Sequence, residues 1–499
     1  MAKNKTIREI RELITEKKIS CMELAVEKIK RIKKEDPKIN SFITITENEA
    51  YAKAKTLDDH LAKNSDEALG MYPLLGIPIG YKDIFLTKGI RTTAGAKLLN
   101  DYVPQYSATV VERLEKAGVM MMGKLNCDAW AHGSSGENSD FGATCNPHNR
   151  DFVAGGSSSG SAASVASDFC TIATATDTCG STRLPANYCG VVGLKPTYGV
   201  ISRYGVIAMA SSLDTVGVMA NSVEDSQTVF EILMGEDKHD ATLLRQGFEG
   251  RGTKTIGLPK EFFEKGLDPE IAKNIDRAVA VFTKLGYKII DVSLPHTKYG
   301  ISVYYIIQPA EVSSNLARFD GVRFGADRSA FSAEAKRRII LGTYVLSLDY
   351  HDAYYKKAME VKAIIVDEVE TVFAKTADFL LAPVSPGLPF KIGEKVSDPL
   401  SLYLMDVYAA TANLSGIPSL ALPFGTSIKG LPMGFQLMGP KFSEQELFTI
   451  GRQFENFVLS CTPCHSREGG NLYKQKTKTW IPHQVRDDSR KGGNDKGKI

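Results

Sequence analysis

Two serine–glycine segments stand close together in the middle of the chain: Gly155-Gly156-Ser157-Ser158-Ser159-Gly160-Ser161 and Asp177-Thr178-Cys179-Gly180-Ser181-Thr182-Arg183. A third segment, Gly76-Ile77-Pro78-Ile79-Gly80, lies upstream and leads to Lys82 and Asp83. Together they supply a nucleophilic hydroxyl, a second hydroxyl and a lysine. These are the groups that acyl transfer at an amide needs when no histidine takes part. The interpretation of the whole chain starts from these segments.

The sequence around these segments predicts strands that alternate with helices. The runs Met71–Ile79 and Val119–Met122 are apolar, short and flanked by glycine, which is typical of buried strands. Residues 254–293 predict a strand–helix–strand unit, and Asp349–Phe373 predicts a long helix. Further strands are predicted at Phe379–Ala382, Ile417–Pro423 and Gly434–Leu437. The predicted fold class is therefore α/β, with a mixed central β-sheet covered by helices on both faces.

We predict three parts along the chain. Residues 1–68 form a helical N-terminal region, in which Ser20-Cys21-Met22-Glu23 is a capping box and Asp36-Pro37 ends the helix that follows it. Residues 69–460 form the catalytic domain. Residues 461–499 are rich in Gly, Asn, Lys and Asp, have almost no apolar periodicity, and are predicted to be a disordered basic tail.

Composition points to a soluble cytoplasmic protein. The 499 residues are 43% apolar and 24% charged, as in ordinary globular proteins. No window reaches the roughly 18 continuous apolar residues that a membrane span needs, and the N-terminus has no apolar segment of a secretory signal. The eight cysteines are scattered through the chain, which favours reduced thiols over disulfides.

The positive charge is concentrated in the tail. Residues 461–499 hold nine basic and four acidic residues, a net charge of +5, so the remaining residues sum to −2. A near-neutral body gives no support for a nucleic-acid footprint. Within the tail, Cys461-Thr462-Pro463-Cys464-His465 matches the c-type haem attachment pattern. Haem attachment would require export, so we favour a chance match in a flexible cytosolic tail.

The serine segments fit two catalytic interpretations. In the first, the run Gly156–Gly160 is the G-x-S-x-G nucleophile elbow of α/β-hydrolases, which needs an acidic residue and then a histidine downstream. The later histidines (239, 296, 351, 465 and 483) stand in polar or ordinary contexts, and the sequence does not exclude such a triad.

The favoured interpretation uses both serine segments and Lys82. Ser181 follows a tight turn in which the backbone N–H groups of Thr178, Cys179, Gly180 and Ser181 can converge on an oxyanion. Ser157 can bridge a base to Ser181. Lys82 can be that base only when neutral, which requires its pKa to fall by roughly three units, or about 4 kcal/mol, from about 10.4. Burial at the end of an apolar strand can supply that shift.

These segments resemble the amidase signature family, the Ser–cis-Ser–Lys hydrolases. The likeness runs from about residue 20 to 455 and continues through Pro185 and the run Cys189–Thr197. It implies that Lys82 is the base, Ser157 the bridging serine with a cis peptide bond, and Ser181 the nucleophile that forms an acyl ester. It also implies the amidase signature fold.

Within the family, several segments are similar to the glutamine-hydrolysing chains of tRNA-dependent amidotransferases: Ser135–Ser139, Gly199–Gly205, Ala210–Asp214, Glu311–Arg323 and Arg337–Thr343. The resemblance implies a heterotrimer with B and C subunits, L-glutamine as substrate, and ammonia passed to the B subunit. It implies no metal or other cofactor on this chain, since ATP and Mg²⁺ act on the B subunit, which also holds most of the tRNA.

The chain departs from the family pattern at three positions. Cys179 and Ser159 stand where the family usually has glycine, and Lys362 stands where we expect an arginine for the carboxylate of glutamine. A Cβ at 179 can narrow the pocket, and a lysine loses the bidentate fork of arginine.

The other candidate substrate-binding residues are Arg183 and Asp406. Arg183 either contacts substrate or braces Asp177, whereas Asp406 is either a pocket residue or a structural carboxylate. Trp130 and His132 are predicted to serve packing. Two rival functions stay open: a stand-alone amidase for another amide, which Lys362 and Cys179 favour, and a scaffold subunit without catalysis.

Overall fold

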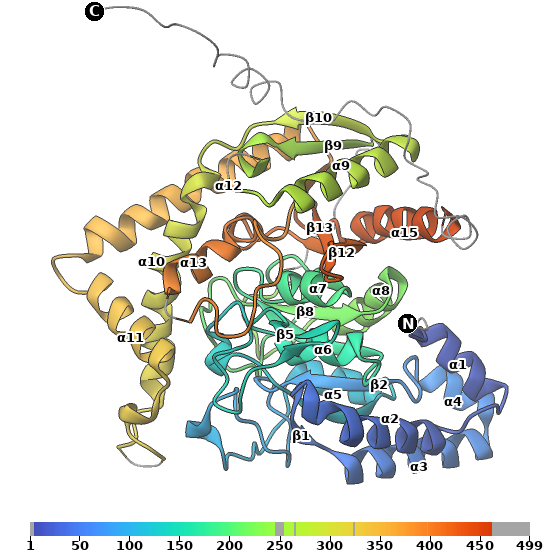
Figure 1. Cartoon of the computed structure of the whole chain (residues 1–499). Helices are drawn as coiled ribbons and strands as arrows, with labels where there is room; N and C mark the ends of the chain where they lie inside the picture. Colours follow the sequence, from blue (N-terminus) through green and yellow to red (C-terminus); the bar gives the residue numbers. More distant parts are fainter. Residues whose placement is uncertain (1–3, 245–253, 264–265, 323–324, 397, 462–499) are drawn as a thin grey trace, which may run out of the picture.

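The computed structural model describes residues 4–244, 254–263, 266–322, 325–396 and 398–461. The predicted disordered tail, with the Cys461–His465 motif, lies outside these residues except for Cys461. Within the described residues, eleven strands form one sheet (Figure 1). In spatial order they are β1 (Phe42–Ile45), β3 (Met120–Leu125), β2 (Pro78–Lys82), β6 (Ile172–Asp177), β8 (Thr215–Ala220), β7 (Val192–Lys195), β12 (Ser419–Thr426), β13 (Pro432–Met438), β11 (Phe379–Ala382), β9 (Thr255–Pro259) and β10 (Lys288–Val292).

The sheet is mixed. β3, β2 and β6 are parallel neighbours, and so are β11, β9 and β10, whereas the strands between β6 and β11 pair antiparallel. A separate antiparallel pair consists of β4 (Cys145–Asn146) and β5 (Asn149–Val153). Helices flank the sheet, which confirms the predicted α/β class.

The α-helices fall into three groups along the chain. Those before the first serine segment are α1 (Ile7–Thr15), α2 (Cys21–Glu35), α3 (Glu47–Lys63), α4 (Ser65–Met71) and α5 (Thr109–Lys116). The middle group is α6 (Ser159–Ala166), α7 (Arg183–Cys189), α8 (Val223–Leu233) and α9 (Pro269–Lys284). The last group is α10 (Gly300–Asn315), α11 (Ala333–Val345), α12 (Lys357–Lys375), α13 (Pro399–Tyr403), α14 (Ala410–Leu414) and α15 (Glu444–Cys461).

The capping box predicted at Ser20 is present, because its hydroxyl accepts from the Glu23 N–H and the Glu23 carboxylate accepts from the Ser20 N–H. The N-terminal helices lie together at one end of the molecule, and α9 with β9 and β10 at the other (Figure 1). Apolar side chains of the N-terminal helices, such as Ile10 and Ile29, share one hydrophobic core with sheet residues such as Ile172.

Three local expectations need correction. Residues 1–68 are not purely helical, because β1 pairs antiparallel with β3 at the sheet edge. The strand predicted at Met71–Ile79 begins only at Pro78, since the chain first turns through Gly76 at a φ of +72°. The predicted helix Asp349–Phe373 is a π-helical turn at His351–Lys356 followed by α12. The strand–helix–strand unit at 254–293 is confirmed as β9, α9 and β10.

Candidate active site

Three loops meet at one edge of the sheet. β2 and β6 are parallel neighbours, so their carboxyl ends lie at the same edge, where α/β proteins commonly bind ligands. Lys82 is the last residue of β2, and Asp177 is the last residue of β6, just before the Ser181 turn. The third loop carries Ser157 and leads into α6. The topology therefore brings together residues that lie up to a hundred positions apart in the sequence.

Lys82 is fully buried among hydroxyl groups. Its Nζ donates to Ser157 Oγ at 2.8 Å, to Ser158 Oγ at 3.0 Å and to Thr176 Oγ1 at 2.8 Å. Burial lowers the pKa of Lys82 to about 8, although nearby carboxylates such as Asp128 oppose the shift. About a tenth of this lysine is therefore neutral at pH 7, and the neutral form is the one that a general base requires.

The Ser157 loop is tightly constrained. The peptide bond between Gly156 and Ser157 is cis, as the resemblance implies. The Gly156 N–H donates to the Ser134 carbonyl at 2.8 Å, and the Asp128 N–H donates to the Ser157 carbonyl at 3.2 Å. A side chain at position 156 would collide with the Asp128 carboxylate, so only glycine fits there. The loop thus holds the Ser157 hydroxyl against Lys82.

Asp177 shapes the turn that carries Ser181. Its carboxylate accepts from the Gly180 N–H at 2.7 Å, and Gly180 has a φ of +97°, which suits glycine. The Ser158 N–H donates to the Ser181 carbonyl at 3.2 Å, so the two serine loops are joined directly. Ser181 is 7% exposed, whereas Ser157 is fully buried. Ser181 is therefore the serine that a substrate can reach.

The predicted oxyanion donors need one correction. The Gly180 N–H is engaged by Asp177 and cannot turn toward a substrate oxygen without losing that bond. The N–H groups of Thr178, Cys179 and Ser181 are left as the candidate donors.

Arg183 holds Asp177 in place and does not contact substrate, so the structure favours the second of its two predicted roles. Its guanidinium forms a fully buried ion pair with Asp177 and also donates to Gln436 Oε1, Asn413 Oδ1 and the Ala409 carbonyl. These protein acceptors surround it, so it is not placed to bind substrate. Arg183 instead holds the carboxylate that shapes the Ser181 turn, and it keeps the pKa of Asp177 far below its usual range against the effect of burial.

Asp406 borders the Ser181 turn. Its carboxylate accepts from the Ser134 hydroxyl, and the Cys179 thiol lies 4.0 Å from its backbone carbonyl. Burial raises the pKa of Asp406 to about 7. The structure therefore places Asp406, as predicted, beside the turn that carries the nucleophile, and it gives Cys179 a packing position there.

Lys362 lies on α12 in a separate hollow of about 490 Å³, which it lines together with Tyr198 and Ser212. Lys82, Ser157 and Ser181 do not line this hollow. Burial lowers the pKa of Lys362, and the charges that act on it are those of Glu311 and Lys441. This placement gives no support to the predicted contact between Lys362 and the substrate.

Arg338, on α11, is a functional candidate that the sequence reasoning missed. It is buried, pairs with Glu334 at 2.8 Å, and donates to Gln308 Oε1 at 2.8 Å. Its guanidinium also lies over the rings of Tyr305 and Tyr403, 5.2 and 5.5 Å from their centroids.

The charge of Arg338 reaches the Ser181 turn. It lowers the pKa of both Asp406 and Cys179 against the effect of burial. The only sequence signal was its place in the run Arg337–Thr343, since nothing in helical periodicity separates Arg338 from the exposed basic residues beside it.

Ser159 and Trp130 make their contacts with residues other than Lys82, Ser157 and Ser181. The Ser159 hydroxyl donates to Thr144 Oγ1 at 3.1 Å. Trp130 packs as predicted: its ring centroid lies 4.8 Å from the ring centroid of Phe319 and 5.4 Å from that of Phe331.

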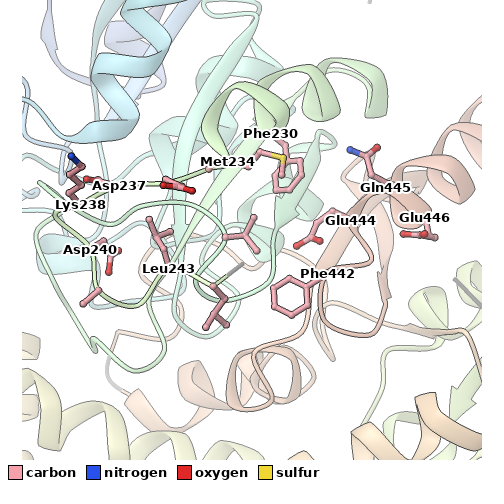
Figure 2. A pocket seen from close by; sticks show the side chains of 15 residues that line it. Phe230, Met234, Asp237, Lys238, Asp240, Leu243, Phe442, Glu444, Gln445 and Glu446 are labelled. Carbon is pink, nitrogen blue, oxygen red and sulfur yellow. The ribbon is translucent and has the colours of Figure 1, made fainter. Parts of the chain in front are cut away.

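A second cavity of about 620 Å³ lies between the end of α8 and the start of α15 (Figure 2). Phe230, Met234 and Phe442 contribute apolar walls, and acidic residues such as Asp237 and Glu444 lie around them. Lys82, Ser157 and Ser181 are not part of its lining. Geometry and chemistry, rather than cavity size, therefore identify the serine loops as the candidate active site.

The described residues contain no group of three or more His, Cys, Asp or Glu side chains arranged to hold a metal ion. None of the helices in the described ranges combines the length and the apolar content that a membrane span needs.

The fold and the serine loops define the class of protein. The amidase family model matches residues 23–448, and the chain belongs to this family. It is 44% identical over 489 residues to the A subunit of the glutamyl-tRNA(Gln) amidotransferase of Geobacter metallireducens, covering 93% of this chain and 99% of that protein.

Solved structures of amidase-family proteins also superimpose on this chain. The A subunit of the glutamyl-tRNA(Gln) amidotransferase of Thermotoga maritima superimposes with a TM-score of 0.77 at 38% identity, over 91% of this chain and 94% of that one. A bacterial aryl acylamidase of the amidase signature family superimposes with a TM-score of 0.79 at 26% identity, over 92% of this chain and 97% of that one.

Proposed function

We propose that this chain is the glutamine-hydrolysing subunit of a tRNA-dependent amidotransferase. In this role it supplies ammonia for the conversion of Glu-tRNA(Gln), Asp-tRNA(Asn) or both into their amides. The observation that carries the proposal is the buried contact of Lys82 with Ser157, in a chain 44% identical to the A subunit of a glutamyl-tRNA(Gln) amidotransferase.

The first half of the reaction forms an acyl-enzyme. Neutral Lys82 accepts the proton of the Ser157 hydroxyl while Ser157 accepts the proton of Ser181. The Ser181 oxygen then forms a bond to the side-chain amide carbon of glutamine. The negative charge that develops on the carbonyl oxygen is stabilised by the N–H groups of Thr178, Cys179 and Ser181.

The second half releases both products. The bond between the amide carbon and nitrogen breaks, and the proton held by Lys82 returns through Ser157 to the leaving nitrogen, which departs as ammonia. A water molecule then attacks the ester on Ser181 with the same relay as base. Glutamate leaves, and Ser181 regains its proton.

Arg338 and Asp406 supply opposite charges beside the Ser181 turn. A free amino acid amide carries an α-carboxylate and an α-ammonium group, so a buried guanidinium and a carboxylate match its two charges. The pKa of Asp406, raised to about 7 by burial, falls again when an ammonium group binds beside it. In this proposal Asp406 keeps its predicted place among the substrate-binding residues, and Arg338 replaces Arg183 and Lys362.

The proposal places partners and cofactors outside this chain. A B subunit receives the ammonia, uses ATP and Mg²⁺, and holds most of the tRNA, and a small C subunit joins the two. The body of this chain is near neutral, in keeping with tRNA bound mainly by a partner.

The test is ammonia release from L-glutamine by the chain co-expressed with candidate B and C subunits, with Ser181→Ala as the control. Release that depends on Ser181 and rises with charged tRNA and ATP supports the proposal. An assembled complex that hydrolyses no glutamine would overturn it.

The likeness to the aryl acylamidase favours a second candidate, a stand-alone amidase. Hydrolysis of an amide by the isolated chain, at a rate that partner subunits do not change, would select that function. A purely structural subunit is the third candidate, and covalent labelling of Ser181 by an acylating probe would eliminate it.

A further inference from the structure

The hollow of about 490 Å³ beside α12, which we call the Lys362 hollow, has a lining that suits an anion. Lys362 and Val366 lie one helical turn apart on α12 and form one wall, and Lys441, in the loop between β13 and α15, contributes to another. Among the described residues that line this hollow, the two lysines are the only charged side chains. The cavity in Figure 2 has the opposite character, since five acidic residues and one lysine line it.

Lys362 has no hydrogen bond and no ion pair with any residue in the described ranges. Its side chain is partly buried, and burial lowers its pKa; the charge of Glu311 opposes this shift, and that of Lys441 adds to it. The Glu311 carboxylate is engaged elsewhere, because the Ser212 N–H donates to its Oε2 at 2.9 Å and the Ser212 hydroxyl donates to its Oε1. Lys362 is therefore a cation that has lost part of its hydration without gaining a partner, which an anion in the hollow would correct.

Lys441 is held in place but keeps donors for a ligand. Its Nζ donates to Glu370 Oε1 at 2.9 Å, and an ammonium group has three donors in all. Its stem lies against the wall of the hollow, since a Cβ added to Gly416 would lie 3.9 Å from Lys441 Cε. Two lysines with unused donors thus face one hollow.

The rest of the lining suits an organic group. Leu244, Val366, Leu414 and Phe442 supply apolar surface, and Tyr198 adds a second aromatic ring. The volume of about 490 Å³ lies within the range that small-molecule sites occupy. A ligand that fits this lining combines an anionic group for the lysines with a small apolar or aromatic body.

We propose that the Lys362 hollow binds a small organic phosphate monoester, with the phosphate between Lys362 and Lys441 and the organic group against the apolar wall. A phosphate monoester carries about −1.5 to −2 charges near neutral pH, which matches two ammonium groups, and lysine is a common phosphate ligand. A phosphodiester, as in a nucleic acid, carries one charge per phosphate and matches the pair less well. The site is separate from the serine relay, because Lys82, Ser157 and Ser181 do not line it.

The test is isothermal titration calorimetry of the full chain near neutral pH, with phenyl phosphate as the probe. Inorganic phosphate lacks the organic group, methyl phenyl phosphate is a diester with one charge, and phenol has no charge. Lys362→Met and Lys441→Met each remove one ammonium group and keep an apolar stem. Lys357→Met is the matched control, because it removes a lysine of the same helix that does not line the hollow.

We expect the wild-type chain to bind phenyl phosphate with a Kd of about 1 mM or less, and Lys362→Met and Lys441→Met each to raise this Kd by about ten-fold or more. Lys357→Met should bind as the wild type does. Inorganic phosphate and methyl phenyl phosphate should bind about ten-fold more weakly than phenyl phosphate, because each lacks one of the two matched features. Phenol should show no binding at the same concentrations, and added salt should weaken the binding of phenyl phosphate.

An absence of saturable binding, or a Kd that Lys362→Met leaves unchanged, would overturn the proposal. An equal loss in Lys357→Met would do so as well, since it would assign the effect to overall charge. Equal affinity for methyl phenyl phosphate would refute the choice of a monoester, equal affinity for inorganic phosphate would refute the organic group, and equal affinity for phenol would refute the anion site. The titration requires no glutamine hydrolysis, so its result does not depend on the proposed function.

Discussion

The ε-amino group of Lys82 lies 2.8 Å from the hydroxyl oxygen of Ser157, and neither side chain reaches solvent. Water cannot stabilise the ammonium form of this lysine, so the cost of burial falls on the charged state. The pair therefore couples a lysine of lowered pKa to a serine loop that is joined by a backbone hydrogen bond to Ser181.

The first prediction concerns pH. Because the pKa of Lys82 is lowered to about 8, its neutral fraction increases as the pH rises through that value. The kcat/KM for glutamine should therefore rise between pH 6 and 9, by about ten-fold per unit well below the pKa. Asp406, with a pKa of about 7, makes the rise steeper below that pH. Asp406→Asn should lower kcat/KM and remove this added steepness, while the rise that belongs to Lys82 stays. A flat profile over this range would contradict a lysine base.

The second prediction separates the two serines. Ser181→Ala should abolish both glutamine hydrolysis and labelling by an acylating probe, with a loss of about 10³-fold or more. Ser157→Ala should also lower kcat strongly, but it keeps the nucleophile and should still be labelled slowly. Rapid turnover by Ser181→Ala would mean that another group attacks the amide.

The third prediction concerns Asp406. Its replacement by Asn removes the negative charge that we assign to the α-ammonium group of glutamine, and the KM should rise by about ten-fold. Glutaric acid monoamide, which lacks that ammonium group, serves as the internal control, and its KM should change little. Equal changes for both substrates would assign Asp406 to the structure of the Ser134 loop instead.

The fourth prediction concerns stability. Arg183→Met leaves the Asp177 carboxylate buried without its partner, so the free energy of unfolding at pH 7 should fall by about 3–5 kcal/mol. The wild-type ion pair holds the pKa of Asp177 low, so its contribution stays nearly constant between pH 7 and pH 4 and is lost only below the pKa of the unfolded chain. In Arg183→Met, burial without the guanidinium raises the pKa of Asp177, and protonation of this carboxyl as the pH falls from 7 to 4 relieves the destabilisation. The difference between the proteins should therefore shrink in acid.

Denaturant unfolding at pH 7 and at pH 4 measures this effect. Lys357→Met, which removes an exposed ion pair with Glu360, is the control and should change stability by less than about 1 kcal/mol. A similar small change for Arg183→Met would contradict its role as the brace of the Ser181 turn.

Several parts of the molecule were predictable from the sequence because their signals are local. The capping box at Ser20 lies within four residues, and the strand at Phe379–Ala382 is one uninterrupted apolar run. The start of β2 was misplaced because the apolar run before it continues through the turn at Gly76, and hydropathy does not distinguish a buried turn from a buried strand.

The sequence by itself determined which residues can form the relay. Lys82, Ser157 and Ser181 stand in short segments with distinctive sequences. Gly156 and Gly180 are required there by steric and backbone constraints that are local to each loop. Their catalytic roles remain predictions that the kinetic experiments above test.

Only the tertiary structure decided what surrounds the relay. Arg183 is a brace because Gln436 and Asn413, more than two hundred residues away, accept its hydrogen bonds. Arg338 replaces Lys362 as the candidate for the substrate carboxylate because α11 brings its charge close enough to lower the pKa of Asp406 against burial, whereas α12 places Lys362 in another hollow. The physical reason is that the function of a charged side chain depends on its partners and its burial, and long-range packing sets both.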